Sequence, residues 1–166
     1  MAIRNYDDAF ITYLEGVEGA STKVYYDKIG RCWTGYCGIT KGVTKDTVHT
    51  LEEWREILKE HLEEFVTNLN KWCDDYAIEY PTQNSFNATL SLVWNVGVAE
   101  AFQKYKAKKS GTFMYCCIHK DWAGAGDAML TFCKGRDPQT GKLITIQGLL
   151  NRRKKDRELF LTGLTQ

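Results

Sequence analysis

The chain has 166 residues, of which 43% are hydrophobic and 13% aromatic, and 22 basic residues nearly balance 21 acidic ones. This composition excludes a disordered chain, and the length suits one domain that buries a core of its own. A net charge of +1 provides no long-range attraction for an anionic polymer, which argues against a nucleic-acid-binding protein.

The cysteines lack the spacing of a metal site. None are arranged as Cys-x-x-Cys, and none has a histidine at zinc-ligand spacing. Six cysteines in a chain of this length are also too few for a fold held together by disulfides. We therefore expect no structural metal and reduced, mostly buried thiols. The cysteines are Cys32, Cys37, Cys73, Cys116, Cys117 and Cys133.

The first fifty residues change character at Lys23. Before it, Asp7 and Asp8 can open a short helix whose apolar positions run to Val17. From Lys23 to Val43, β-branched and aromatic residues are interrupted by four glycines, which predicts short strands and tight turns. The first twenty residues contain no apolar run long enough for a signal peptide or a membrane span.

The clearest helix begins at Thr50, which forms a capping box with Glu53. Apolar residues then recur at steps of three and four as far as Trp72, opposite an acidic outer face. This pattern predicts an amphipathic helix of about 22 residues.

Pro81 forces a break, and Thr82 and Ser85 can cap another helix that Gly97 ends. The remaining predicted elements are helices at 101–108, 112–118 and about 120–134, an exposed turn-rich segment at 134–142, and a final helix at about 146–161.

These elements predict an α+β fold in which residues 1–166 form one domain. A small Gly-rich β-hairpin lobe covers about residues 23–49, and a long helix at about 51–73 joins it to a larger helical lobe. The helical lobe takes in about residues 82–166 and the N-terminal helix. A cleft between two such lobes is where an extended polymer can lie.

Two carboxylates near the N-terminus are candidates for acid–base chemistry. Glu18 ends the first helix before Gly19, and Asp27, nine residues later, lies where a strand enters a turn. Hydrolysis of a glycosidic bond requires a carboxylic acid that protonates the leaving oxygen, and an inverting enzyme needs a second group that holds water. A half-shielded and a hydrated carboxylate would have pKa values that are pushed apart. Glu15 is also followed by glycine and is the alternative acid.

Three segments in order along the chain carry a family resemblance. They are residues 18–40 (EGASTKVYYDKIGRCWTGYCGIT), residues 90–102 (LSLVWNVGVAEAF) and residues 148–163 (GLLNRRKKDRELFLTG). The first resembles the active-site stretch of the phage lysozymes, glycoside hydrolases of the T-even and lambdoid endolysin kind. The second is similar to that family's helix with an Asn-x-Gly ending, and the third to its closing helix.

The resemblance implies a lysozyme-like fold and hydrolysis of the β-1,4 bond between N-acetylmuramic acid and N-acetylglucosamine in bacterial peptidoglycan. Glu18 would be the general acid, and Asp27 and Thr34 would hold the attacking water, giving inversion. Arg152 would orient or tune Glu18, and Asn95 would line the sugar groove.

Within the first segment, Tyr36 falls on the family pattern and Trp33 is a candidate sugar platform. No metal or cofactor is needed, because protonation and a positioned water supply the chemistry. The resemblance further implies a monomer that acts on glycan strands without inserting stably in a membrane. Lacking an export signal, it would wait in the host cytoplasm until a holin opens the membrane.

The chain departs from the family pattern at three places. Thr34 follows Asp27 by seven positions where the family usually has six, so the hairpin carries an extra residue. Ile39 stands where the family often has a histidine. Arg153 adjoins Arg152, so the choice between these arginines depends on register alone.

Three alternatives stay open. A lytic transglycosylase would use one glutamate and no held water. A peptidoglycan-binding module without activity is the second alternative, which the altered hairpin allows. Nucleic-acid binding through the basic final helix is the third, although no recognition motif accompanies it.

Overall fold

The computed structural model describes residues 2–28, 30–137 and 139–164; Ile29 and Pro138, which fall in predicted strand and turn segments, lie outside the described residues. The chain divides into two compact units. We call residues 8–64 the small unit and residues 1–7 with 65–166 the helical unit. The predicted α+β class is confirmed: the chain is mostly helical and carries small hairpins.

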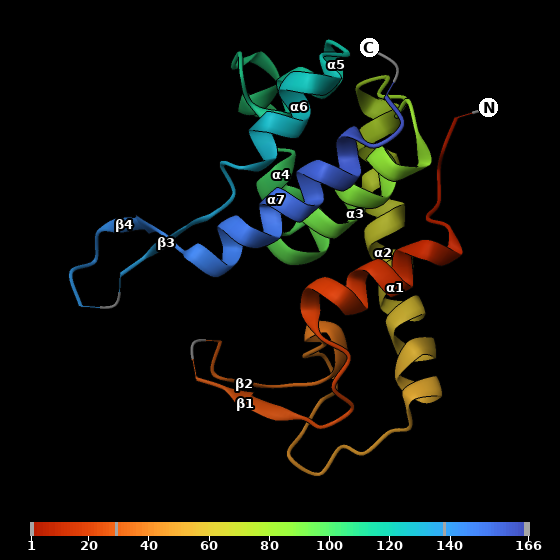
Figure 1. The fold of residues 1–166 in the computed structure, drawn as a ribbon, viewed down its shortest axis with the longest axis vertical. Coiled ribbons are helices and arrows are strands. Elements are labelled where there is room, and N and C mark those ends of the chain that lie inside the picture. Colours follow the sequence, from red (N-terminus) through yellow and green to blue (C-terminus); the bar gives the residue numbers. More distant parts are fainter. Residues whose placement is uncertain (1, 29, 138, 165–166) are drawn as a thin grey trace. The chain divides into compact units, whose positions relative to one another are not determined.

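The small unit contains a hairpin, the helix α1 and the first part of the helix α2 (Figure 1). The hairpin strands pair antiparallel, and the first helix packs against the 3-10 turn that follows the hairpin. The elements are α1 (Asp8–Glu18), β1 (Tyr25–Asp27), β2 (Cys32–Thr34), η1 (Tyr36–Gly38) and the first part of α2 (Leu51–Asp75).

Trp54 of α2 is the packing centre of the small unit. Its ring is 1% exposed and stacks on Tyr36 at 6.3 Å between centroids. Its indole nitrogen donates a hydrogen bond to the carbonyl of Thr22, before the hairpin, at 3.2 Å. The backbone after the hairpin lies directly on the same ring, because a Cβ on Gly35 would come within 2.5 Å of it. One side chain therefore holds the entry and the exit of the hairpin.

The helix predicted from Thr50 is present and extends to Asp75. Its capping box is confirmed, since the Thr50 amide donates to Glu53 at 2.7 Å and the Glu53 amide donates to the Thr50 hydroxyl at 3.2 Å. The inward positions Leu58, Leu62 and Leu69 are fully buried, as the apolar spacing predicted.

The helical unit packs its central helix α3 against α7, while α6 packs against both α5 and α7 (Figure 1). The predicted cap of α3 is confirmed, with Thr82 and Ser85 exchanging side-chain and backbone hydrogen bonds. The elements are α3 (Gln83–Val96), α4 (Val98–Ala101), η2 (Lys104–Lys108), α5 (Phe113–Ile118), α6 (Trp122–Met129), β3 (Lys134–Arg136), β4 (Leu143–Thr145) and α7 (Gln147–Leu161).

Two segments of this unit differ from prediction. The helix predicted at 101–108 is wrong: α4 ends at Ala101, and η2 follows. Phe102 leaves helical geometry because its ring is buried against Trp72 and Phe113, at 6.0 and 5.7 Å. Tertiary burial has overridden local helix preference at this position.

The segment 134–142 was predicted only as an exposed turn, and it forms part of the β3–β4 hairpin. The turn closes on Asp137, whose carboxylate accepts hydrogen bonds from the amides of Gln139 and Thr140 at 2.8 and 2.7 Å. These bonds hold the pKa of Asp137 below its ordinary value. Correspondingly, α6 ends at Met129, short of the predicted helix at 120–134.

None of the six cysteines is in a disulfide, and five of them are buried. In the described part of the chain, no helix is both long and apolar enough to cross a bilayer.

Candidate active site

Glu18 is the last residue of α1 and is half-buried. Gly19 ends the helix with a φ of +91°, a conformation that glycine adopts without steric cost. The Glu18 carboxylate faces the turn η1, because a Cβ on Gly38 would lie 3.9 Å from Glu18 Oε2. The sequence-predicted acid is therefore placed against the turn that follows Thr34.

Asp27 and Thr34 share one face of the hairpin. The strand register pairs Tyr25 with Thr34 and Asp27 with Cys32. Side chains of directly paired residues and of alternate residues along a strand point to the same side. Asp27 and Thr34 therefore point to the same side of the hairpin. Their separation of seven positions along the chain does not prevent this, because the turn between the strands sets which residues are paired.

Cys32 lies between these two residues on the same face, and the sequence analysis assigned it no role at the site. Its sulfur is 3.9 Å from Thr34 Oγ1. A Cβ on Gly30 would lie 2.8 Å from Asp27 Oδ2 and 3.3 Å from Cys32 Sγ, so the carboxylate and the thiol both lie beside this glycine. Strand alternation would have found Cys32 once the register was known.

Trp33 points to the opposite face of the hairpin. Its ring lies edge-on to that of its cross-strand partner Tyr26, with centroids 5.5 Å apart. On the face that carries Asp27, the exposed aromatic residue is Tyr25, which is 56% exposed.

Glu15, the alternative acid, is bound into a network with Arg55 and Tyr36. Arg55 donates two hydrogen bonds to its carboxylate, at 2.8 and 3.2 Å, and the Tyr36 hydroxyl donates a third. The hydrogen bond from Arg55 holds the pKa of Glu15 below its ordinary value, while burial raises the pKa of the Tyr36 phenol. These hydrogen bonds favour the ionised form of the Glu15 carboxyl, which carries no proton to donate.

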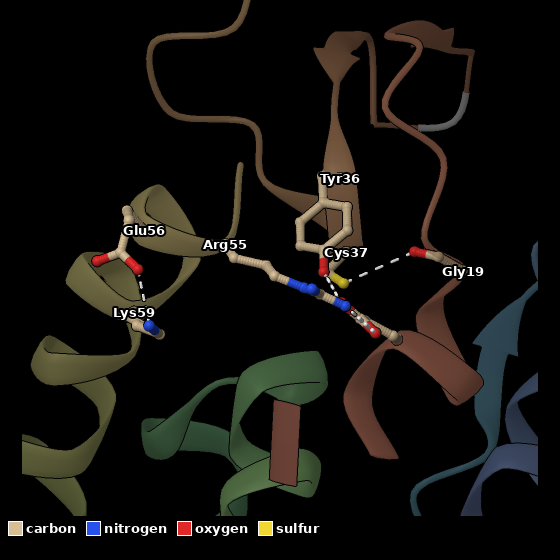
Figure 2. Close-up of polar contacts among 7 residues, drawn as sticks. Gly19, Tyr36, Cys37, Arg55, Glu56 and Lys59 are labelled. Carbon is tan, nitrogen blue, oxygen red and sulfur yellow. Dashed lines mark hydrogen bonds and ion pairs between the residues drawn. The ribbon is translucent and has the colours of Figure 1, made fainter. Parts of the chain in front are cut away.

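Figure 2 shows Arg55 reaching from α2 toward the Tyr36 hydroxyl, and the thiol of Cys37 directed at Gly19. That thiol donates to the Gly19 carbonyl at 3.6 Å. Tyr36 itself is 1% exposed. Its side chain is enclosed within the small unit and contacts residues that flank the candidate site. Arg55 was not anticipated, because nothing in the helical pattern of α2 distinguishes it from other outward residues.

Arg152 and Asn95 belong to the helical unit. The Arg152 guanidinium donates to the Ser91 carbonyl on α3 at 3.3 Å, and Asn95 is exposed in the last turn of that helix. The neighbouring Arg153 is fully buried and forms an ion pair with Asp156 at 2.9 Å. Arg153 therefore has a structural partner inside this unit.

Within the described ranges, no group of three or more His, Cys, Asp or Glu side chains lies close enough to hold a metal ion. The chemistry available at the small unit is that of carboxylates, a hydroxyl and a thiol.

The fold is that of known endolysins. The endolysin from Escherichia coli O157:H7 phage FAHEc1 superimposes with a TM-score of 0.77 at 25% identity, over 98% of this chain and 96% of that one. The active form of the P1 phage endolysin superimposes with a TM-score of 0.75 at 21% identity, over 99% of this chain and 88% of that one. An endolysin of Acyrthosiphon pisum secondary endosymbiont phage 1 is 28% identical over 151 residues, covering 90% of this chain and 93% of the relative.

The phage lysozyme family matches residues 15–156, and the chain belongs to that family. It is accordingly a glycoside hydrolase of the endolysin kind, and peptidoglycan is the substrate that this membership implies. The resemblance seen in the three sequence segments, the lysozyme-like fold class and the prediction of an enzyme are confirmed.

Proposed function

We propose that this endolysin hydrolyses the β-1,4 bond between N-acetylmuramic acid and N-acetylglucosamine with inversion, as a monomer. Glu18 protonates the leaving oxygen, and Asp27 and Thr34 hold the water that attacks the sugar. The observation that carries the proposal is the position of Glu18 against Gly38, in the turn that continues from the strand of Thr34. The shared hairpin face of Asp27 and Thr34 supports their common role.

The state of Glu15 supports the choice of acid. A general acid must carry its proton at working pH, and the Arg55 hydrogen bonds keep Glu15 ionised. Arg152 and Asn95 are proposed as supporting residues on the family pattern alone. Arg152 donates a hydrogen bond to the Ser91 carbonyl of α3.

The test is loss of turbidity of outer-membrane-stripped Gram-negative cells, with wild type compared to Glu18→Gln. Removing a general acid lowers the rate by about 10²-fold or more. Glu56→Gln is the matched control, because it makes the same chemical change at a side chain of the small unit that is 70% exposed. If Glu18→Gln clears the suspension as fast as wild type, Glu18 is not the acid.

Product analysis separates the enzyme alternatives. Reducing muramic ends identify hydrolysis, whereas 1,6-anhydro ends identify a lytic transglycosylase. Glu18→Gln should keep wall binding when it loses activity, because the substitution leaves the shape of the side chain unchanged.

A further inference from the structure

The last turn of α1 is attached to the turn η1 at two points, one on each side of Glu18. Upstream, the Tyr36 hydroxyl donates to the Glu15 carboxylate. Downstream, the Cys37 thiol donates to the Gly19 carbonyl at 3.6 Å. A helix end that is not attached frays readily, since its final carbonyls have no partners within the helix. The two contacts therefore restrain the residue that lies between them.

The same turn follows directly from the strand that carries Thr34. Only Gly35 separates Thr34 from η1, and the backbone of Gly35 packs closely against the ring of Trp54. The turn η1 therefore connects the helix end that carries Glu18 to the strand that carries Thr34. The turn also holds Cys37 at a φ of +52°, an uncommon conformation for a residue with a Cβ. Such conformations persist where surrounding contacts determine them.

Arg55 completes the attachment from α2. Its planar guanidinium makes two hydrogen bonds to Glu15, and such bidentate pairs are the directional form of a charge-assisted contact. The Glu15 side chain is only 13% exposed, so an ionised carboxylate at this position depends on its donors. Glu15 also lies one helical turn before Glu18, on the same side of α1.

From these contacts we infer that Glu15, Arg55 and Tyr36 are positioning residues that hold Glu18 at a fixed distance from Thr34 during hydrolysis. The inference rests on the proposed role of Glu18. In this role the three residues need no contact with substrate or with the reacting atoms. They act through the helix end and the turn, so they should affect the rate of the chemical step more than substrate affinity.

The variants that test this are Tyr36→Phe, Glu15→Gln and Arg55→Gln. Tyr36→Phe keeps the ring on Trp54 and removes only the hydroxyl. The matched control is Lys59→Gln, which breaks the exposed Glu56–Lys59 pair at 2.7 Å, one turn further along α2 (Figure 2). Rates are measured on soluble peptidoglycan strands over a range of concentrations, at a temperature well below the melting point of every variant.

Each of the three variants should lower kcat by about tenfold and change KM by less than about twofold, because a misplaced acid slows the chemical step. Lys59→Gln should match wild type. The double variant Glu15→Gln with Tyr36→Phe should lose no more than the worse single variant, since the residues act as one unit. Arg55→Lys keeps the charge but cannot make the two parallel hydrogen bonds of the guanidinium, so its kcat should stay well below that of wild type.

Two failures can be told apart. Wild type that does not cleave the strands, or Glu18→Gln that cleaves as well as wild type, overturns the proposed function and this inference with it. If wild type is active and Glu18→Gln is not, while Tyr36→Phe and Glu15→Gln retain wild-type kcat, the positioning role alone is overturned. A wild-type kcat in Arg55→Lys would likewise reject the geometric role, because charge would then suffice.

Discussion

The ion pairs described in the two units differ in how far they are exposed to water. In the small unit, Glu15 and Arg55 are 13% and 41% exposed, and the pair lies at the end of the helix that carries Glu18. In the helical unit, Arg153 and Asp156 are both fully buried on α7, and Asp156 also accepts a hydrogen bond from Ser91 of α3 at 2.7 Å. Water screens the first pair in part and is excluded from the second.

The comparison indicates what each unit requires of its charges. Breaking a buried pair leaves a charge that water cannot solvate, so the helical unit depends on both partners for stability. A half-exposed pair contributes little to stability but fixes geometry where two elements meet. The pair in the small unit therefore joins α1 to α2, whereas in the helical unit the carboxylate of Asp156 also binds Ser91 of α3.

The largest effect is expected at the buried pair. Asp156→Ala should lower the free energy of unfolding by about 3–5 kcal/mol, because it leaves the Arg153 guanidinium buried without this carboxylate. Urea unfolding followed by circular dichroism measures the loss. Replacing both partners, as Arg153→Met with Asp156→Leu, should recover most of it, and a double variant less stable than Asp156→Ala would contradict the argument.

A smaller effect is expected at the contact between Gly35 and Trp54 in the small unit. Gly35→Ala should destabilise the protein by about 1–3 kcal/mol, because the new Cβ would lie 2.5 Å from the indole ring. Gly16→Ala is the matched control within α1. It meets nothing within 4 Å and should stabilise by about 0.5–1 kcal/mol in a thermal melt. Equal melting temperatures for the two variants would rule out the close contact.

The smallest effect is the pH dependence contributed by Glu15. Its pKa is lowered in the folded chain, chiefly by Arg55, so its contribution to stability is present above the pKa of the unfolded chain, about 4.3. That contribution is lost as pH falls through the lower, folded pKa. Glu15→Gln should therefore flatten the decline of stability below about pH 4.3, measured by urea unfolding at successive pH values.

Arg55→Gln should flatten the same decline, because it removes the main cause of the lowered pKa. If stability declined with falling pH as steeply in both variants as in wild type, Arg55 would not be the cause of the lowered pKa of Glu15. The ion pair of the small unit would then not contribute to stability through that lowered pKa.

The sequence by itself determined the elements whose signals are local. The apolar spacing from Leu51 and the Thr50–Glu53 box specified α2, because side chains three and four apart share a helix face. The Glu18–Gly19 step marked a helix end that carries a carboxylate, and the capping pair Thr82–Ser85 marked the start of α3. Each of these depends on residues within one or two turns of each other.

Tertiary structure alone decided the arrangement of the site. Glu15 and Arg55 are 40 residues apart and meet only because α1 and α2 pack in the same unit. Whether Asp27 and Thr34 face the same way depended on the turn between them, since one residue of register would send Thr34 to the other face. Likewise Phe102 left the helix predicted at 101–108 to fill an aromatic core. Long-range contacts of this kind follow from packing, which no short stretch of residues encodes.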